Sequence, residues 1–255
     1  MALGAPIEIV GLLATLEPAL ALCFMLPGGL LTDRLGRKRM IILGISFRLL
    51  AYLMFMLAQT WQQLIVGLVF KGLAMSTSPA IVSLSLESFP SKRMATGMGF
   101  VVMVVLLSAT VAMPLGGIAM DACGVLDGMR LVLTASMILA IVSLISRLRL
   151  RETLESRKTE GVRFSFRGLL SSFRLERGEL GLLVTQMFVV IGMIMSRHFL
   201  VVYATEVIQL SETQWGLIQM SLFLSWAALS LPGGMVADRY RKPAILVAII
   251  INPIT

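Results

Sequence analysis

The sequence predicts an all-α protein that crosses a membrane many times. Three observations predict this fold class: an excess of apolar residues, a regular alternation of basic connections, and an internal repeat of one loop. Hydrophobic residues make up 57% of the 255 residues and charged residues only 14%, with a mean hydropathy of +0.90. A soluble domain is about 45–50% apolar and about 25% charged. Much of the apolar surface must therefore face lipid.

Seven apolar runs are long enough to cross a bilayer, whose core needs about 20 helical residues. An eighth run begins at 243 and stops at Thr255, so we expect the chain to be cut within that span. The complete runs have the approximate bounds 9–31, 40–58, 62–86, 94–119, 129–148, 180–204 and 214–232.

The lysines and arginines gather in every second connection between these runs. The basic connections are 34–39, 92–93, 147–177 and 239–242. Arg130 lies at the mouth of a run, and Arg48, Lys71 and Arg197 lie inside runs. Membrane proteins keep basic loops in the cytoplasm, so we expect these loops inside, Met1 outside, and the cell membrane as the location. Nucleic-acid binding, which the net charge of +8 could otherwise suggest, would not produce this alternation.

The one long polar connection, 149–179, has apolar residues at helical spacing from Phe166 to Phe173, with arginines between them. This pattern predicts an amphipathic helix lying on the cytoplasmic membrane face. We therefore divide the chain into an N-terminal half (1–148), a cytoplasmic central loop (149–179) and the start of a C-terminal half (180–255).

One loop sequence occurs twice. Residues 26–38, LPGGLLTDRLGRK, recur at 231–242 as LPGGMVADRYRK, with one residue dropped where the first copy has Gly36. The copies are six spans apart, and an even number of spans keeps the same orientation. The sequence therefore predicts two parallel six-helix repeats, an architecture of transporters whose halves rock about a central site.

The first copy resembles the signature loop between the second and third helices of major facilitator superfamily (MFS) transporters, and the second copy resembles its counterpart between the eighth and ninth. The resemblance implies an MFS-type bundle of which this chain holds helices two to nine of twelve, incomplete at both ends. In that family these loops latch the two halves and release them during transport. The latch candidates are Gly29, Asp33, Arg34, Gly36, Arg37 and Lys38 in the first copy, and Gly234, Asp238, Arg239, Arg241 and Lys242 in the second.

The residue types of the first copy fit such a latch. Gly28 and Gly29 allow two helices to pack closely. Gly36 permits a tight turn, and Asp33 can stabilise a nearby helix N-terminus or pair with an arginine. The alternative is that this loop only forms a turn and sets the topology, because its charges alone satisfy the positive-inside rule.

Four charged residues lie inside apolar runs, in one band about 10–15 Å below the outer surface at 1.5 Å per residue. They are Glu17, Arg48, Lys71 and Arg197. A charge at mid-bilayer costs about 2.5–3.5 kcal/mol on insertion scales, so each needs a partner or water. One interpretation is structural: Glu17 pairs with Arg48 or Lys71. The other is a cavity for an anionic or zwitterionic substrate, with Glu17 as a proton or cation site.

Three weaker motifs also resemble the family. Residues 87–93 resemble the loop between helices four and five, which makes Glu87 a candidate for the cytoplasmic gate. Residues 113–117, MPLGG, resemble the fifth-helix motif of exporters, with the proline one position later; the alternative is a proline kink without that role. The fourth helix of many proton-linked members has an arginine four residues before a glycine; here that position is Leu68, and the base is Lys71.

We expect a secondary transporter of small molecules that works by alternating access, with proton-coupled export as a candidate form. The alternatives are a polytopic membrane enzyme and a non-transporting scaffold. No nucleophile–base pair, Cys/His cluster or phosphate-binding G-x-x-x-x-G-K-[ST] loop favours an enzyme, and a scaffold need not repeat its loop after six spans. The expected partners are the lipid bilayer, a small-molecule substrate and, as candidates, protons; we expect no cofactor and no nucleic acid.

Overall fold

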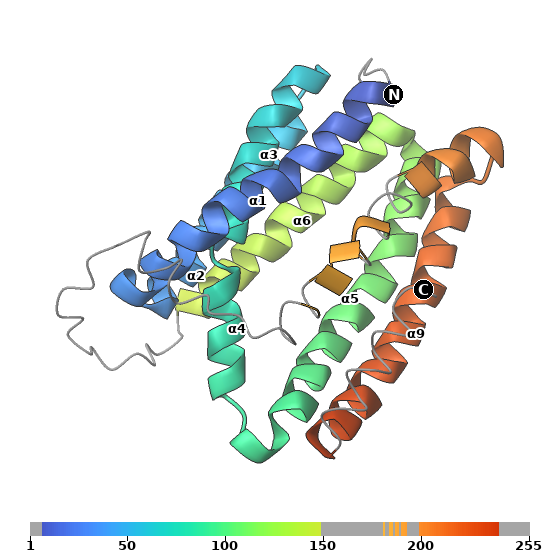
Figure 1. Cartoon of the computed structure of the whole chain (residues 1–255). Helices are drawn as coiled ribbons and strands as arrows, with labels where there is room; N and C mark the ends of the chain where they lie inside the picture. The colour runs from blue at the N-terminus through green and yellow to red at the C-terminus, as the bar shows by residue number, and fades with distance from the viewer. Residues whose placement is uncertain are drawn as a thin grey trace.

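The computed structural model describes residues 7–148 and 199–239, and a few positions between 181 and 192. The regular elements of these residues are helices (Figure 1). They are α1 (Ile7–Leu35), α2 (Arg37–Leu57), α3 (Trp61–Met75), α4 (Ser78–Glu87), a 3₁₀ turn (Ser91–Arg93), α5 (Met94–Cys123), α6 (Val125–Leu148), a π-helical turn (Tyr203–Val207) and α9 (Glu212–Arg239). The expected amphipathic helix and the run that begins at 243 lie outside the described residues.

Five helical segments of the described chain are long and apolar enough to cross a membrane. They are Arg37–Leu57, Trp61–Glu87, Ser91–Cys123, Val125–Leu148 and Glu212–Arg239. The first helix, α1, adds a shorter apolar stretch, Gly11–Met25. The prediction of an all-α membrane protein is therefore confirmed, and each predicted run before the central loop coincides with described helices.

The predicted run 62–86 is not one continuous helix, because it breaks at Ser76 and Thr77 into α3 and α4. Pro79 lies in the first turn of α4, where its missing N–H leaves no helical hydrogen bond unmade. The Thr77 hydroxyl donates a hydrogen bond to the Ala74 carbonyl at 2.8 Å. Proline together with hydroxyls that bond the preceding turn makes a local break more favourable than an unbroken helix.

The helices form two groups that lean apart in Figure 1. The second helix, α2, packs against both α3 and α6, and α1 packs against α3. On the other side, α5 runs antiparallel to α9 along most of its length, and the end of α5 turns directly into α6 (Figure 1). The second group therefore contains one helix from before the central loop and one from after it.

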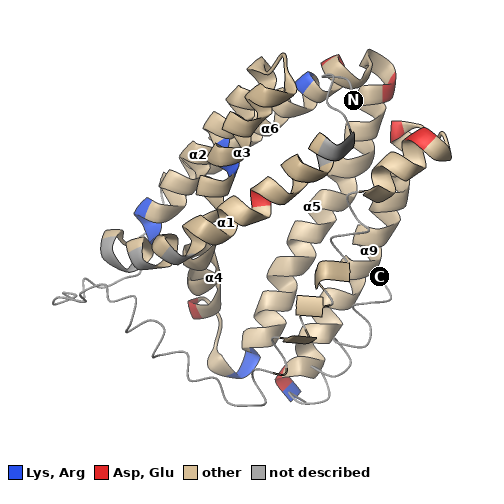
Figure 2. Cartoon of the chain, turned by 45° about the horizontal axis from the view of Figure 1, so that its top comes forward, with Lys and Arg blue, Asp and Glu red and all other residues tan. Residues whose placement is uncertain are grey.

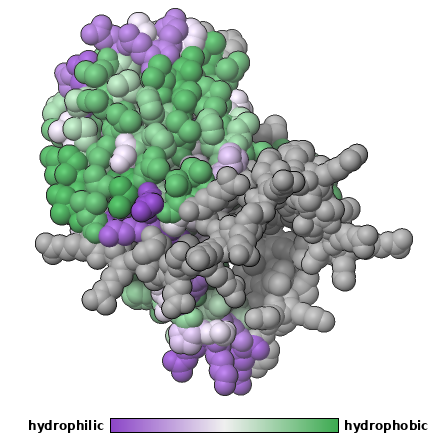
Figure 3. All heavy atoms as spheres, turned by 90° about the vertical axis from the view of Figure 1, so that its left-hand side faces the viewer, coloured by the Kyte–Doolittle hydropathy of each residue, from purple (hydrophilic) through white to green (hydrophobic). Residues whose placement is uncertain are grey.

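Basic residues mark one end of this bundle. Figure 2 shows lysines and arginines near the start of α2, the turn before α5 and the end of α9. We call this end, which also contains the end of α6, the basic end, and the end with the α5–α6 turn the opposite end. Between the ends, most of the coloured surface in Figure 3 is hydrophobic. Large apolar side chains such as Leu22 (71% exposed) and Leu139 (70% exposed) lie open on the helices, as expected where lipid is the solvent.

Candidate functional site

The contact between α5 and α9 depends on glycines at both of its ends. A Cβ added at Gly234 would lie 2.5 Å from the Ala95 carbonyl oxygen, and one added at Gly117 would lie 2.7 Å from the Cα of Thr213. Real Cβ atoms essentially never come so close to backbone, so only glycine permits this approach. Small residues at such contacts are typical of membrane helices, which associate mainly through close packing.

At the basic end, Asp238 of α9 caps the N-terminus of α5. One carboxylate oxygen accepts a hydrogen bond from the Ala95 N–H at 3.0 Å. The other accepts from the Thr96 N–H at 2.9 Å and from the Thr96 hydroxyl at 2.6 Å. The first N–H groups of a helix have no partner within the helix, and the positive end of its dipole favours a negative charge. Asp238 therefore ties the second copy of the repeated loop to the start of α5.

At the opposite end, Asp121 of α5 caps the N-terminus of α9 in the same way. Its two carboxylate oxygens accept hydrogen bonds from the N–H groups of Glu212, at 3.1 Å, and Thr213, at 3.0 Å. The next N–H group, of Gln214, donates to the Ser211 hydroxyl at 3.2 Å, and the Gln214 side chain accepts from the Ser211 N–H at 2.9 Å. This capping box and Asp121 together satisfy the first turn of α9.

The two helices thus cap each other, one at each end of their contact. We call α5, α9 and the two caps of Asp121 and Asp238 the α5–α9 clamp. Each cap joins a residue before the central loop to one after it. Each cap breaks when the ends of α5 and α9 that it joins move apart. Chemically, the clamp can hold either end closed by carboxylate–amide hydrogen bonds that need no covalent change to open.

The first copy of the repeated loop makes different contacts. Gly36 separates α1 from α2 with φ 88°, a left-handed conformation that favours glycine. The Arg37 side chain forms an ion pair with Glu87 at the end of α4. The structure therefore joins a latch candidate to the gate candidate, and both lie before the central loop.

The two glycines expected to allow close packing behave differently. A Cβ added at Gly28 would lie 2.7 Å from the Ser76 Cβ, so Gly28 permits α1 to approach the α3–α4 break. A Cβ at Gly29 would meet no described atom within 4 Å. The prediction that Gly29 allows close packing is therefore wrong for the part of the chain described. The side chains of Asp33 and Arg34 lie outside the described structure, as do Arg241 and Lys242 entirely.

Among the charges inside the helices, Lys71 and Glu17 form an ion pair. The Lys71 Nζ donates to a carboxylate oxygen of Glu17 at 2.8 Å, which joins α3 to α1. Next to the pair, Leu20 of α1 lies against Gly72 of α3. The side chains are 43% and 33% exposed, for Lys71 and Glu17 respectively, so the described residues cover the pair only in part.

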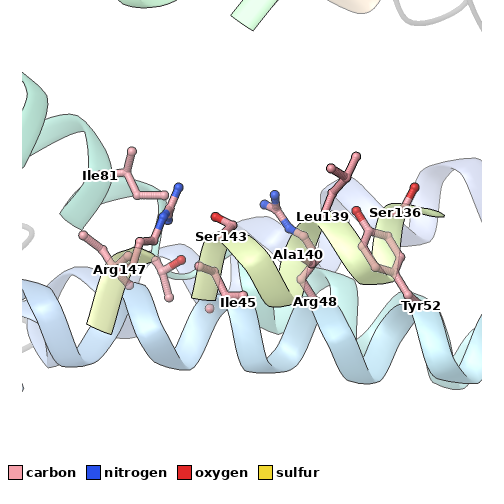
Figure 4. A pocket seen from close by; sticks show the side chains of 12 residues that line it. Ile45, Arg48, Tyr52, Ile81, Ser136, Leu139, Ala140, Ser143 and Arg147 are labelled. Carbon is pink, nitrogen blue, oxygen red and sulfur yellow. The ribbon is translucent and has the colours of Figure 1, made fainter. Parts of the chain in front are cut away.

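Arg48 does not take part in this pair. It lines a separate pocket between α2, α4 and α6, together with Arg147 (Figure 4), and neither Glu17 nor Lys71 lines that pocket. Of the two pairs expected for Glu17, only the one with Lys71 occurs. Arg197, the fourth charge of the expected band, lies outside the described residues. The other three charges form two separate groups, the Glu17–Lys71 pair and Arg48 in its own pocket.

Sequence reasoning missed Asp121 and Arg147 as site residues. Asp121 lies in a connection without lysine or arginine, four residues after Gly117, and an acid so close to a pair of glycines is the signal that could have identified it. Arg147 was counted with the basic loop, although it lies in the last turn of α6. Among the described residues, no group of three or more His, Cys, Asp or Glu side chains could hold a metal ion.

A bundle of apolar helices of membrane-crossing length, with a capped helix pair bridging the two sides of its central loop, defines an integral multi-pass membrane protein. The sequence matches the family profile of the Major Facilitator Superfamily over residues 2–254. The chain therefore belongs to this family, and it is a membrane transporter of MFS type. Comparisons with curated proteins and with solved structures give no significant match.

Proposed function

We propose that this transporter moves its substrate by alternating access, in which the α5–α9 clamp opens at one end at a time. The observation that carries the proposal is the reciprocal capping by Asp121 and Asp238. Because each cap lies at one end of the contact, rocking of α9 against α5 breaks one cap and keeps the other. A rigid pair that pivots in this way gives a central site access to one side of the membrane and then the other.

The two caps differ in exposure, which affects the balance between the two open states. Asp238 is half-buried, whereas Asp121 is exposed. Hydrogen bonds to charged groups are stronger where water competes less. We therefore expect the basic end to be the more firmly closed of the two in the absence of substrate.

Distances across both ends of the clamp test this proposal. The free cysteines, Cys23 and Cys123, are first replaced by serine. Spin labels are then attached to cysteines at Met94 and Val236 for the basic end, or at Leu115 and Leu217 for the opposite end; all four of these residues are exposed. Double electron–electron resonance in nanodiscs should give two populations of distance for each pair of labels. Conditions that lengthen the distance of one pair should leave the distance of the other pair short. Simultaneous lengthening of both pairs would contradict a pivot.

Proton coupling is the second part of the proposal, and the Glu17–Lys71 pair supports it. Glu17 is a carboxylate within the helical bundle that can take up a proton, and Lys71 offsets its charge when the proton leaves. Export is the direction favoured by the resemblance of residues 113–117 to the exporter motif. Everted vesicles with an imposed pH gradient and a panel of fluorescent anionic and zwitterionic compounds test both points. Accumulation that an uncoupler does not reduce would reject proton coupling.

The orientation completes the proposal: the protein lies in the cell membrane with its basic end facing the cytoplasm. The grouping of basic residues at this end supports it. A membrane-impermeant maleimide should label a cysteine at Asp127, at the opposite end, in intact cells, and a cysteine at Lys92 only after the cells are opened. The reverse pattern would invert the topology.

A further inference from the structure

We propose that Arg48 and Arg147 form an anion site between α2 and α6, apart from the Glu17–Lys71 pair, and that this site binds a phosphate-type group. The pocket has a volume of about 290 Å³. Besides the two arginines, its polar lining includes Tyr52 of α2 and Ser136 and Ser143 of α6. Figure 4 shows the Ser143 hydroxyl between the two guanidinium groups.

The charges in this pocket are unbalanced. Arg147 is close enough to Arg48 for the two like charges to interact. Within the described residues, neither arginine forms an ion pair with an acidic side chain, while Arg37, Lys71 and Arg130 all do. Two neighbouring cations in an apolar bundle repel each other and lose hydration, so an anion between them removes both penalties.

The donors match a tetrahedral oxyanion. Each guanidinium offers up to five N–H donors in a fork that fits phosphate oxygens in a bidentate manner, and the three hydroxyls can donate to the remaining oxygens. The volume is slightly below that of ordinary ligand pockets, which range over roughly 300–1,000 Å³. A headgroup-sized anion therefore fits better than a large substrate.

The position of the site suggests how an anion reaches it. Arg147 lies in the last turn of α6 at the basic end, and Arg48 lies about 16 Å along α2 from Arg37, at 1.5 Å per residue. Basic pockets between helices on this side of membranes bind anionic headgroups. The same donors would also bind free phosphate from the aqueous side, so the two sources share one chemistry.

Binding to the purified full chain tests the site. The unfolding temperature is measured with increasing phosphatidylglycerol against a phosphatidylcholine background, and separately with inorganic phosphate. We expect saturable stabilisation by at least one of them. Each of the substitutions R48Q and R147Q should raise the half-saturation concentration about five-fold, and the double variant should raise it about 25-fold. These factors follow if each arginine contributes about as much as a basic residue at an anionic membrane surface. The matched control is R130Q, which removes an exposed arginine at the opposite end.

The two titrations distinguish a lipid headgroup from free phosphate as the bound anion. Stabilisation by phosphatidylglycerol that phosphate does not reduce assigns the site to a lipid headgroup, while competition by millimolar phosphate assigns it to a soluble anion. Should a glutamine variant fold poorly, R48K and R147K keep the charge and lose the bidentate fork, so the affinity should still fall. Equal half-saturation for wild type and the double variant would overturn the proposal.

Discussion

Asp121 and Asp238 lie at opposite ends of one helix pair, and each caps the helix to which the other belongs. Asp121 belongs to α5 and accepts hydrogen bonds from the start of α9. Asp238 belongs to α9 and accepts from the start of α5. Opening of either end therefore breaks hydrogen bonds at one aspartate only, so the two residues bias the protein in opposite directions.

The first prediction is that D238A and D121A shift the conformational equilibrium in opposite senses. Loss of an N-terminal cap costs about 1 kcal/mol, so D238A should raise the population open at the basic end about five-fold. D121A should favour the state open at the opposite end, by a smaller factor because water already competes for that cap. The Met94–Val236 and Leu115–Leu217 label distances measure both shifts. Asp127 provides the control: among the described residues its ion-pair partner is Arg130 of the same helix, so D127A should change neither distance.

The second prediction compares neighbouring glycines in the clamp. G117A and G234A each introduce a methyl group into the backbone of the facing helix, so the helices must move apart and the closed form should lose stability. In G116A and G233A the added Cβ meets no described atom within 4 Å, so these controls should keep the wild-type unfolding temperature. The unfolding temperature and transport rate of all four variants are measured together. Equal behaviour within either neighbouring pair would contradict the proposed register of α5 against α9.

These contacts illustrate which parts of the molecule could be predicted from the sequence. Hydropathy predicted the helices, since about 20 apolar residues have no other stable form in lipid. The repeated loop led to Asp238 because a motif keeps residue types at fixed spacing. Asp121 has no such motif: its role follows from α9 lying beside it, about 90 residues further along the chain.

The dependence on packing between helices also explains why Arg48 lies apart from Glu17 and Lys71, with which the sequence grouped it. Depth along a helix can be computed from residue number, so the sequence groups Arg48 and Lys71 by depth alone. The face of a helix that each residue occupies depends on which helices pack around it. Arg48 lies on the side of α2 that meets α6, whereas Lys71 points towards α1. Packing between helices of similar hydropathy leaves little trace in a single sequence.

The third prediction concerns Glu17 and Lys71. Each of E17Q and K71Q leaves one charge without its partner and should lower the unfolding free energy by about 1 kcal/mol, a modest figure because both side chains are partly exposed. The double variant E17Q/K71Q should recover most of this loss. A double-mutant cycle on thermal unfolding in nanodiscs measures the coupling. Proton-driven transport should remain absent in the double variant, because glutamine cannot take up the proton. Recovered transport would remove Glu17 from the coupling mechanism while leaving the ion pair intact.

The last prediction distinguishes a latch between halves from a contact within one half. Arg37 and Glu87 both precede the central loop, so their ion pair holds the α1–α2 turn against the end of α4 and does not cross to α9. We expect E87Q to lower the unfolding temperature while leaving the Met94–Val236 distance distribution unchanged, in contrast to D238A. The charge-swapped double variant R37E/E87R should restore the stability. Arg39, exposed two residues further along, is the control, and R39Q should match wild type. If E87Q instead opens the basic end as far as D238A does, Glu87 acts on the closure between the halves, and Asp238 is not the main contact that keeps that end shut.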